Sequence, residues 1–171
     1  MSMFSASVPQ IRKMLNNLDG WLRAAEESAT ARGFDADVLL SARLAPDQFH
    51  LARQIRTSCD NAVALACRLS GRDVPVSPDP DTTFAACHAR IATALAALDT
   101  FSEADFAGAA ERQVTLPFLK GKWMTGAEYM NAFALPNLYF HLTTAYSILR
   151  HNGVPLGKMH YIGSIALHDV V

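Results

Sequence analysis

The sequence predicts an all-α fold, a four-helix bundle with a small β-hairpin before its last helix. Four segments repeat apolar residues at steps of three and four, the spacing that places them on one face of an α-helix. The 171 residues include 28 alanines but only 9 glycines, a composition that favours helices. Packing four such faces together is the simplest way to bury them all. The length fits a single domain, assigned to residues 1–171.

The first half of the chain contains the signals for two of these helices. Residues 8–29 carry the first apolar stripe, and Gly33 follows as a stop signal. The second helix is expected to begin at Pro46–Asp47, because proline suits a first helical position and an acid there complements the helix dipole. Gly71 is expected to end it.

The middle of the chain predicts a linker, a third helix and a hairpin. Three prolines exclude a helix from residues 74–80, which we interpret as a linker across one end of the bundle. The third helix follows, with Asp81 or Thr82 as its cap, and its apolar stripe ends near Leu98. Residues 112–125 are in part β-branched and aromatic and contain a turn candidate, which predicts a two-stranded hairpin.

The fourth helix, predicted from Thr125 to about residue 151, is apolar nearly all round. Thr125 and Glu128 form a capping-box pattern, and Pro136 is expected to kink the helix. A helix without a polar face is central in a fold or buried in a subunit interface. The apolar tail, residues 154–171, is expected to pack on the bundle or on a partner subunit.

Composition excludes several classes of function. The chain has 15 Lys and Arg against 16 Asp and Glu, so no basic field exists to hold a nucleic acid. No apolar run approaches the roughly 20 residues that span a membrane, and the N-terminus lacks the pattern of a secretory signal. An odd number of cysteines without a CxxC pair predicts reduced thiols, and therefore a cytoplasmic protein.

The candidate site is a stripe of polar side chains on the apolar fourth helix. Asn137, His141 and Thr144 are spaced four and three residues apart, so they share one face. If that face points inward, each side chain needs a partner. His141 is then either a structural histidine bonded within the core or a group that binds a ligand or metal. Motifs for zinc proteases, serine hydrolases and nucleotide binding are absent from the sequence.

The fourth helix and its exit, residues 135–157, resemble an uncharacterised bacterial family. The segments at residues 44–49 and 83–84 also fit this family, a domain of unknown function within the DinB/YfiT-like superfamily. The resemblance covers nearly the whole chain. It implies a four-helix bundle with an unusual helix order, often assembled as a homodimer.

The resemblance also implies a place for a metal. Many superfamily members hold a divalent ion with three histidines, one from the start of the second helix and an HxxxH pair from the last. The first position falls near His50, and the pair falls on Asn137 and His141. An amide oxygen is a poor substitute for imidazole on zinc or nickel, so we favour a protein without a metal cofactor.

Three hypotheses about function follow. The first is a homodimeric bundle that binds a small molecule in a pocket lined by Asn137, Tyr139, His141 and Thr144. The second is a metal-dependent enzyme of the DinB type, related to thiol-dependent transferases, in which His50, Asn137 and His141 hold the ion. The third is a dimerising scaffold without a site.

Overall fold

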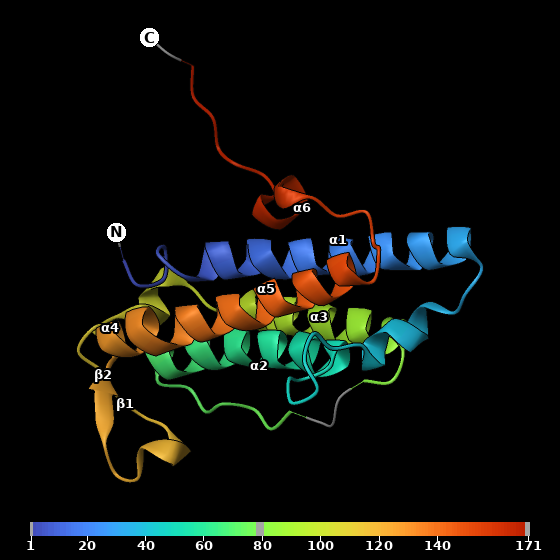
Figure 1. Cartoon of the computed structure of the whole chain (residues 1–171). Helices are drawn as coiled ribbons and strands as arrows, with labels where there is room; N and C mark the ends of the chain where they lie inside the picture. The colour runs from blue at the N-terminus through green and yellow to red at the C-terminus, as the bar shows by residue number, and fades with distance from the viewer. Residues whose placement is uncertain (1, 78–80, 170–171) are drawn as a thin grey trace.

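The computed structural model describes residues 2–77 and 81–169 and confirms the predicted all-α bundle (Figure 1). Helix α2 packs on both α3 and α5, and α1 packs against α3 and α5. None of the helices in the described part of the chain combines the length and apolarity that a membrane crossing requires. The long helices are α1 (Val8–Arg32), α2 (Leu51–Ser70), α3 (Phe84–Leu98) and α5 (Leu135–His151).

Helices α1 and α2 end as the sequence predicts, but α2 begins later. Gly33 and Gly71 have φ of 74° and 79°, the left-handed geometry of a helix stop. The predicted start of α2 at Pro46–Asp47 is wrong, because α2 begins at Leu51, after the short helix η1 (Ala36–Ser41) and a turn. The amide of Leu51 bonds to the carbonyl of Ala42, which closes a non-helical loop over residues 42–50 that includes Pro46.

The segment between α2 and α3 is non-helical as predicted, but its described part runs back beneath α2 and does not cross one end of the bundle. Residues 72–77 have no regular secondary structure and run beneath α2 in Figure 1, and the prolines at 78 and 80 lie outside the described residues. The cap of α3 is neither Asp81 nor Thr82. Thr83 caps the helix, and its hydroxyl accepts from the amide of Ala86 at 3.2 Å. The carboxylate of Asp81 pairs instead with Arg90.

The hairpin and the last long helix are continuous. After η2 (Glu103–Phe106), strand β1 (Gln113–Thr115) pairs antiparallel with β2 (Trp123–Thr125) around the short helix η3 (Pro117–Leu119). The capping box predicted for Thr125 and Glu128 is present. Helix α4 (Gly126–Glu128) leads into the π-helical segment η4 (Tyr129–Ala134) and then into α5.

The break expected at Pro136 takes the form of the π-helical turn that precedes it. The amide of Leu135 bonds to the carbonyl of Met130, five residues back. Proline has no N–H and its ring crowds the carbonyl four residues earlier, and a wider turn relieves both problems. The core beneath this helix is aliphatic, with fully buried residues from three helices at its centre. They include Leu15, Leu18, Leu22, Leu65, Leu69 and Leu142.

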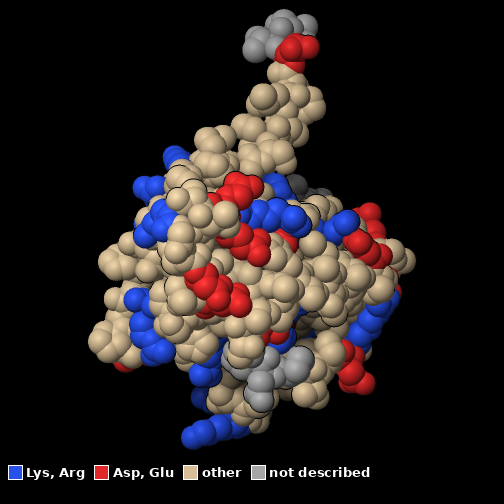
Figure 2. Space-filling model, turned by 90° about the vertical axis from the view of Figure 1, so that its right-hand side faces the viewer, with Lys and Arg blue, Asp and Glu red and all other residues tan. Residues whose placement is uncertain are grey.

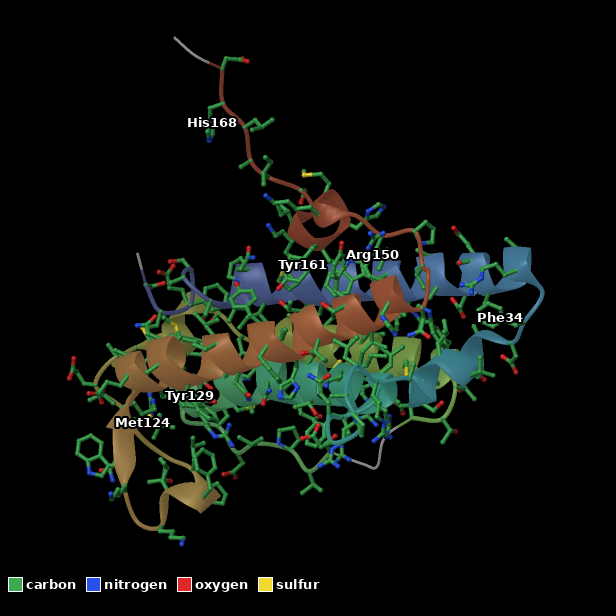
Figure 3. All side chains as sticks on the ribbon, viewed as in Figure 1. Phe34, Met124, Tyr129, Arg150, Tyr161 and His168 are labelled. Carbon is green, nitrogen blue, oxygen red and sulfur yellow. The ribbon has the colours of Figure 1, made fainter. Side chains whose placement is uncertain are left out.

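The tail packs on the bundle over only part of its length. Helix α6 (Lys158–Ile162) lies on α1, where the indole N–H of Trp21 donates to the carbonyl of His160 at 2.8 Å. The ring of Tyr161 points from α6 toward α1 and α5 (Figure 3) and stacks on Trp21 with 5.4 Å between centroids. Beyond α6 the chain leads away from the body, and Leu167 is 80% exposed. Residues 170–171 lie outside the described part.

Charges are mixed over the surface. Figure 2 shows Lys and Arg interspersed with Asp and Glu on the face it presents, in keeping with the formal net charge of −1. One pairing joins two helices: His88 of α3 bridges the carboxylates of Asp19 and Glu26 on α1, at 2.5 and 3.1 Å. His88 therefore sits at the α1–α3 flank.

Candidate functional site

The imidazole of His141 points into the interface between α2 and α5. His141 is only 7% exposed, and its Nδ1 lies 2.7 Å from Oε1 of Gln54 on α2. Burial lowers the pKa of His141 below its ordinary value, because an apolar environment disfavours the charged imidazolium. The ring is therefore neutral at pH 7, with one nitrogen protonated and the other free to accept a hydrogen bond.

A chain of hydrogen bonds decides which nitrogen of His141 carries the proton. Nε2 of Gln54 lies 3.0 Å from the carbonyl oxygen of Phe49. A carbonyl can only accept, so the amide nitrogen must face it, and Oε1 must therefore face the imidazole. Since Oε1 also only accepts, Nδ1 of His141 is the protonated nitrogen. Nε2 of His141 carries the free lone pair, and no hydrogen bond to it exists among the described residues.

Two aromatic rings flank the imidazole. The ring of Phe49 lies nearly parallel to it, with an interplanar angle of 11° and 6.2 Å between centroids. Phe140 meets it edge-on at 5.3 Å. The guanidinium of Arg53 covers the ring of Phe49 at 3.7 Å, a cation–π contact that orders it. Because Phe140 is 55% exposed, this aromatic setting reaches the surface.

The other residues of the predicted pocket divide into two groups. Tyr139 and Thr144 line a shallow surface depression of about 370 Å³ together with Leu44, Phe140, Thr143 and Ser147. Asn137 and His141 are not part of that lining. The hydroxyl of Thr144 donates to the carbonyl of Phe140 at 2.7 Å. Phe140 therefore contacts the imidazole of His141 and also borders the depression.

His50 is the N-cap of α2, and not a residue one turn into the helix as the predicted start at Pro46 implied. Its Nδ1 lies 3.1 Å from the carbonyl of Leu40 and 3.4 Å from the amide of Arg53. One nitrogen cannot donate to a carbonyl and accept from an amide at once. The shorter contact requires a protonated Nδ1 that donates to Leu40, which leaves Nε2 of His50 unprotonated in the neutral ring.

The residues that the resemblance assigns to a metal form an incomplete set. Both His50 and His141 direct Nδ1 at an oxygen, the arrangement that orients many metal-binding imidazoles. The third position is Asn137, an amide. Over residues 2–77 and 81–169, no three His, Cys, Asp or Glu side chains are placed to hold an ion. Two imidazoles and a neutral amide do not fit a tight zinc or nickel site.

Sequence reasoning missed Gln54 and Phe49. A signal for Gln54 was present: it is a polar residue beside the apolar stripe of α2, and with Ser58 it repeats at a step of four. Both are fully buried. The pattern matches the one that singled out His141 on α5. The sequence did not indicate which of these polar residues meet across the helix interface.

Comparison with known proteins identifies the family to which this chain belongs. The domain of unknown function DUF1993 matches residues 3–162. The chain is also similar to a crystal structure of a DinB family member protein from Shewanella denitrificans at 1.83 Å resolution, with 46% sequence identity and a TM-score of 0.94. That match covers 98% of this chain and 96% of the other. No functionally curated protein matches. The chain therefore belongs to the DUF1993 family and has the fold of the DinB proteins.

Proposed function

We propose that this protein binds a small molecule at His141, where α5 packs against α2. The observation that supports this most directly is the hydrogen-bond chain from the Phe49 carbonyl through Gln54 to His141. It fixes a neutral imidazole whose Nε2 lacks a partner among the described residues. His141 as a whole is largely buried, and a nitrogen in that state takes its hydrogen bond from water or from a ligand.

The same geometry favours one kind of ligand chemistry. Nε2 of His141 accepts a hydrogen bond, so the ligand presents a donor such as a hydroxyl or an amine. Phe49 and Phe140 flank the imidazole and favour a flat or apolar body beside that donor. The depression lined by Tyr139 and Thr144 borders Phe140 and extends this surface. Asn137, half-buried one turn before His141, supplies a further amide on the same helix.

A pair of simple probes tests this proposal. Phenol carries a hydroxyl donor, whereas anisole has the same ring without one. Titrated separately and followed by NMR of the backbone amides of α5, phenol is expected to shift the amides around His141 saturably and anisole is not. His151→Gln, an exposed histidine on the same helix, is the control and should leave the phenol response unchanged. Equal responses to both probes, or a phenol response that survives in His141→Phe, would contradict the proposal.

The metal-dependent alternative is favoured by one observation, the orientation of both Nδ1 atoms toward oxygen acceptors. Elemental analysis of protein purified without a metal-affinity tag separates the two functions. We expect no stoichiometric divalent ion. About one zinc or nickel per chain, lost in His141→Ala, would establish the DinB-type metal site in place of the small-molecule site.

We also propose a homodimer formed through the face that carries this site. Leu44 and Phe140, which border the depression, and Phe49, which flanks His141, are exposed apolar residues. A second copy placed there would cover the depression and enclose it. Light scattering is expected to give twice 18.6 kDa, and Phe140→Asp is expected to dissociate the dimer. Val76→Asp, at a 96% exposed residue on another face, is the control. A monomer of the native chain at micromolar concentration would contradict this.

The proposed setting is the bacterial cytoplasm. Cys59, Cys67 and Cys87 are all free and buried. Unpaired thiols favour a reducing compartment, and the similar DinB family member protein comes from Shewanella denitrificans. Cell fractionation with an antibody against the protein tests the location.

A further inference from the structure

A second and larger cavity, of about 650 Å³, lies between α2, α3 and the extended segment 74–77. It shares no lining residue with the His141 surroundings or with the depression beside Phe140. Segment 74–77 runs beneath α2 (Figure 1) and forms one wall. The volume falls within the range of roughly 300–1,000 Å³ that is typical of small-molecule sites.

The walls of this cavity are apolar and made of small side chains. Helix α3 contributes Ala86, Ala89 and Ala97, and α2 contributes Val63 and Ala64. From residue 86 to residue 97 the wall runs for about 16 Å along the helix axis. Alanines at these positions leave open space along the helix where longer side chains would fill it. An elongated aliphatic group fits such a wall.

The polar groups of the cavity favour a ligand that carries hydrogen-bond acceptors. Its two carboxylates are already paired, Asp60 with Arg56 at 3.4 Å and Asp81 with Arg90. Arg68 is different, because its guanidinium donates to the Tyr129 hydroxyl at 3.0 Å but pairs with no carboxylate among the described residues.

Asn61, which lines the same cavity, has a buried amide nitrogen for which the described residues offer no hydrogen-bond partner. Among the described residues, Arg68 lacks a carboxylate partner and the Asn61 amide nitrogen lacks a hydrogen-bond partner. Both groups are donors, and Arg68 is cationic. A buried donor left unsatisfied costs about 1–3 kcal/mol, so a ligand that supplies acceptors is favoured here.

We propose that this cavity binds an aliphatic carboxylate, with its head on Arg68 and its chain along the alanines of α3. The carboxylate matches the guanidinium, which favours planar two-oxygen acceptors. The aliphatic chain of the ligand covers the apolar wall and removes it from water. This favours binding by about 25 cal/mol for each Å² that is buried. The site is independent of the His141 proposal, because the two have no residue in common.

Decanoate, used below its micelle concentration, is the probe, and decanol is its uncharged counterpart. Binding is followed on the native chain by NMR titration of the backbone amides. We expect saturable shifts on α2, α3 and segment 74–77, with decanoate at least ten times tighter than decanol. Arg68→Gln should remove that preference while decanol binding stays as it was.

Two matched variants of α3 test the location. Ala89→Leu places a larger side chain in the cavity and should weaken decanoate binding at least tenfold. Ala92→Leu makes the same change at an exposed residue of α3 outside the lining and should bind as the native chain does. Circular dichroism confirms that both variants fold. Unchanged binding in Ala89→Leu, shifts confined to the His141 surroundings, no saturable binding, or equal affinity for decanol would each overturn the proposal.

Discussion

Gln54 of α2 and His141 of α5 are 87 residues apart in the chain, yet their side chains meet at 2.7 Å inside the helix interface. Because Gln54 is held in turn by the Phe49 carbonyl, the amide cannot present its nitrogen to the imidazole without losing that bond. The pair is therefore a positioning device. It sets the tautomer of His141 and leaves the lone pair of Nε2 free to accept a hydrogen bond from a ligand.

Substituting Gln54 separates its acceptor role from its packing role. Gln54→Leu removes the acceptor and leaves a buried N–H of His141 unsatisfied, so we expect a loss of about 1–3 kcal/mol in the free energy of unfolding. Gln54→Glu keeps an oxygen beside Nδ1 and adds a negative charge, which should raise the pKa of His141. Urea unfolding and NMR titration measure the two effects. A Gln54→Leu protein as stable as the native chain would show that the bond contributes nothing.

The buried imidazole should make the stability depend on pH. Burial places the pKa of His141 in the folded chain below its value of 6.5 in the unfolded chain. The unfolded state therefore binds more protons around and below pH 6.5, and the free energy of unfolding falls as the pH drops through that window. His141→Gln should show a shallower fall there in urea unfolding, whereas His151→Gln, at an exposed site, should match the native chain. Identical profiles for all three proteins would refute the burial effect.

Tyr161 anchors the tail, and its removal should be costly. Its ring stacks on Trp21, and its hydroxyl lies 2.9 Å from that of Thr143. We expect Tyr161→Ala to lower the free energy of unfolding by about 1–3 kcal/mol and to change the fluorescence of Trp21. Leu167→Ala, at an exposed residue beyond α6, should change neither quantity. If both variants behave alike, α6 does not contribute to the packing of the bundle.

Two glycines provide opposite tests of the backbone. A methyl group at Gly126 would overlap the carbonyl oxygen of Ala109, so Gly126→Ala should destabilise the fold by about 1–3 kcal/mol. Gly20 is an exposed position inside α1 with open space around its Cα. Gly20→Ala should therefore stabilise the fold by up to about 1 kcal/mol, because alanine is the better helix former. Thermal unfolding reports both. A Gly126→Ala protein as stable as the native chain would contradict the close approach of Ala109, and a destabilised Gly20→Ala protein would contradict the open space at Gly20.

Local patterns predicted the helices, the hairpin, the glycine stops and the Thr125 cap, because each depends on residues close in sequence. The start of α2 was mispredicted because Pro46, a good local signal, lies in the non-helical loop that the bond from Leu51 to Ala42 closes. The stripe singled out His141 as a residue that could point inward, and the structure places it there. Its partner could not be predicted, since Gln54 is identified only when two helices are packed in register. The cavity beside Arg68 likewise arises from the course of segment 74–77, which no periodicity encodes.

The tautomer of His141 tests the central claim most directly. Long-range proton–nitrogen NMR correlations distinguish the two ring nitrogens, and His141→Gln assigns the signals by their loss. At pH 7.5 we predict a protonated Nδ1 and an unprotonated Nε2, in a ring that is neutral. A proton on Nε2, or an imidazolium with both nitrogens protonated, would contradict the hydrogen-bond chain and the ligand site built on it.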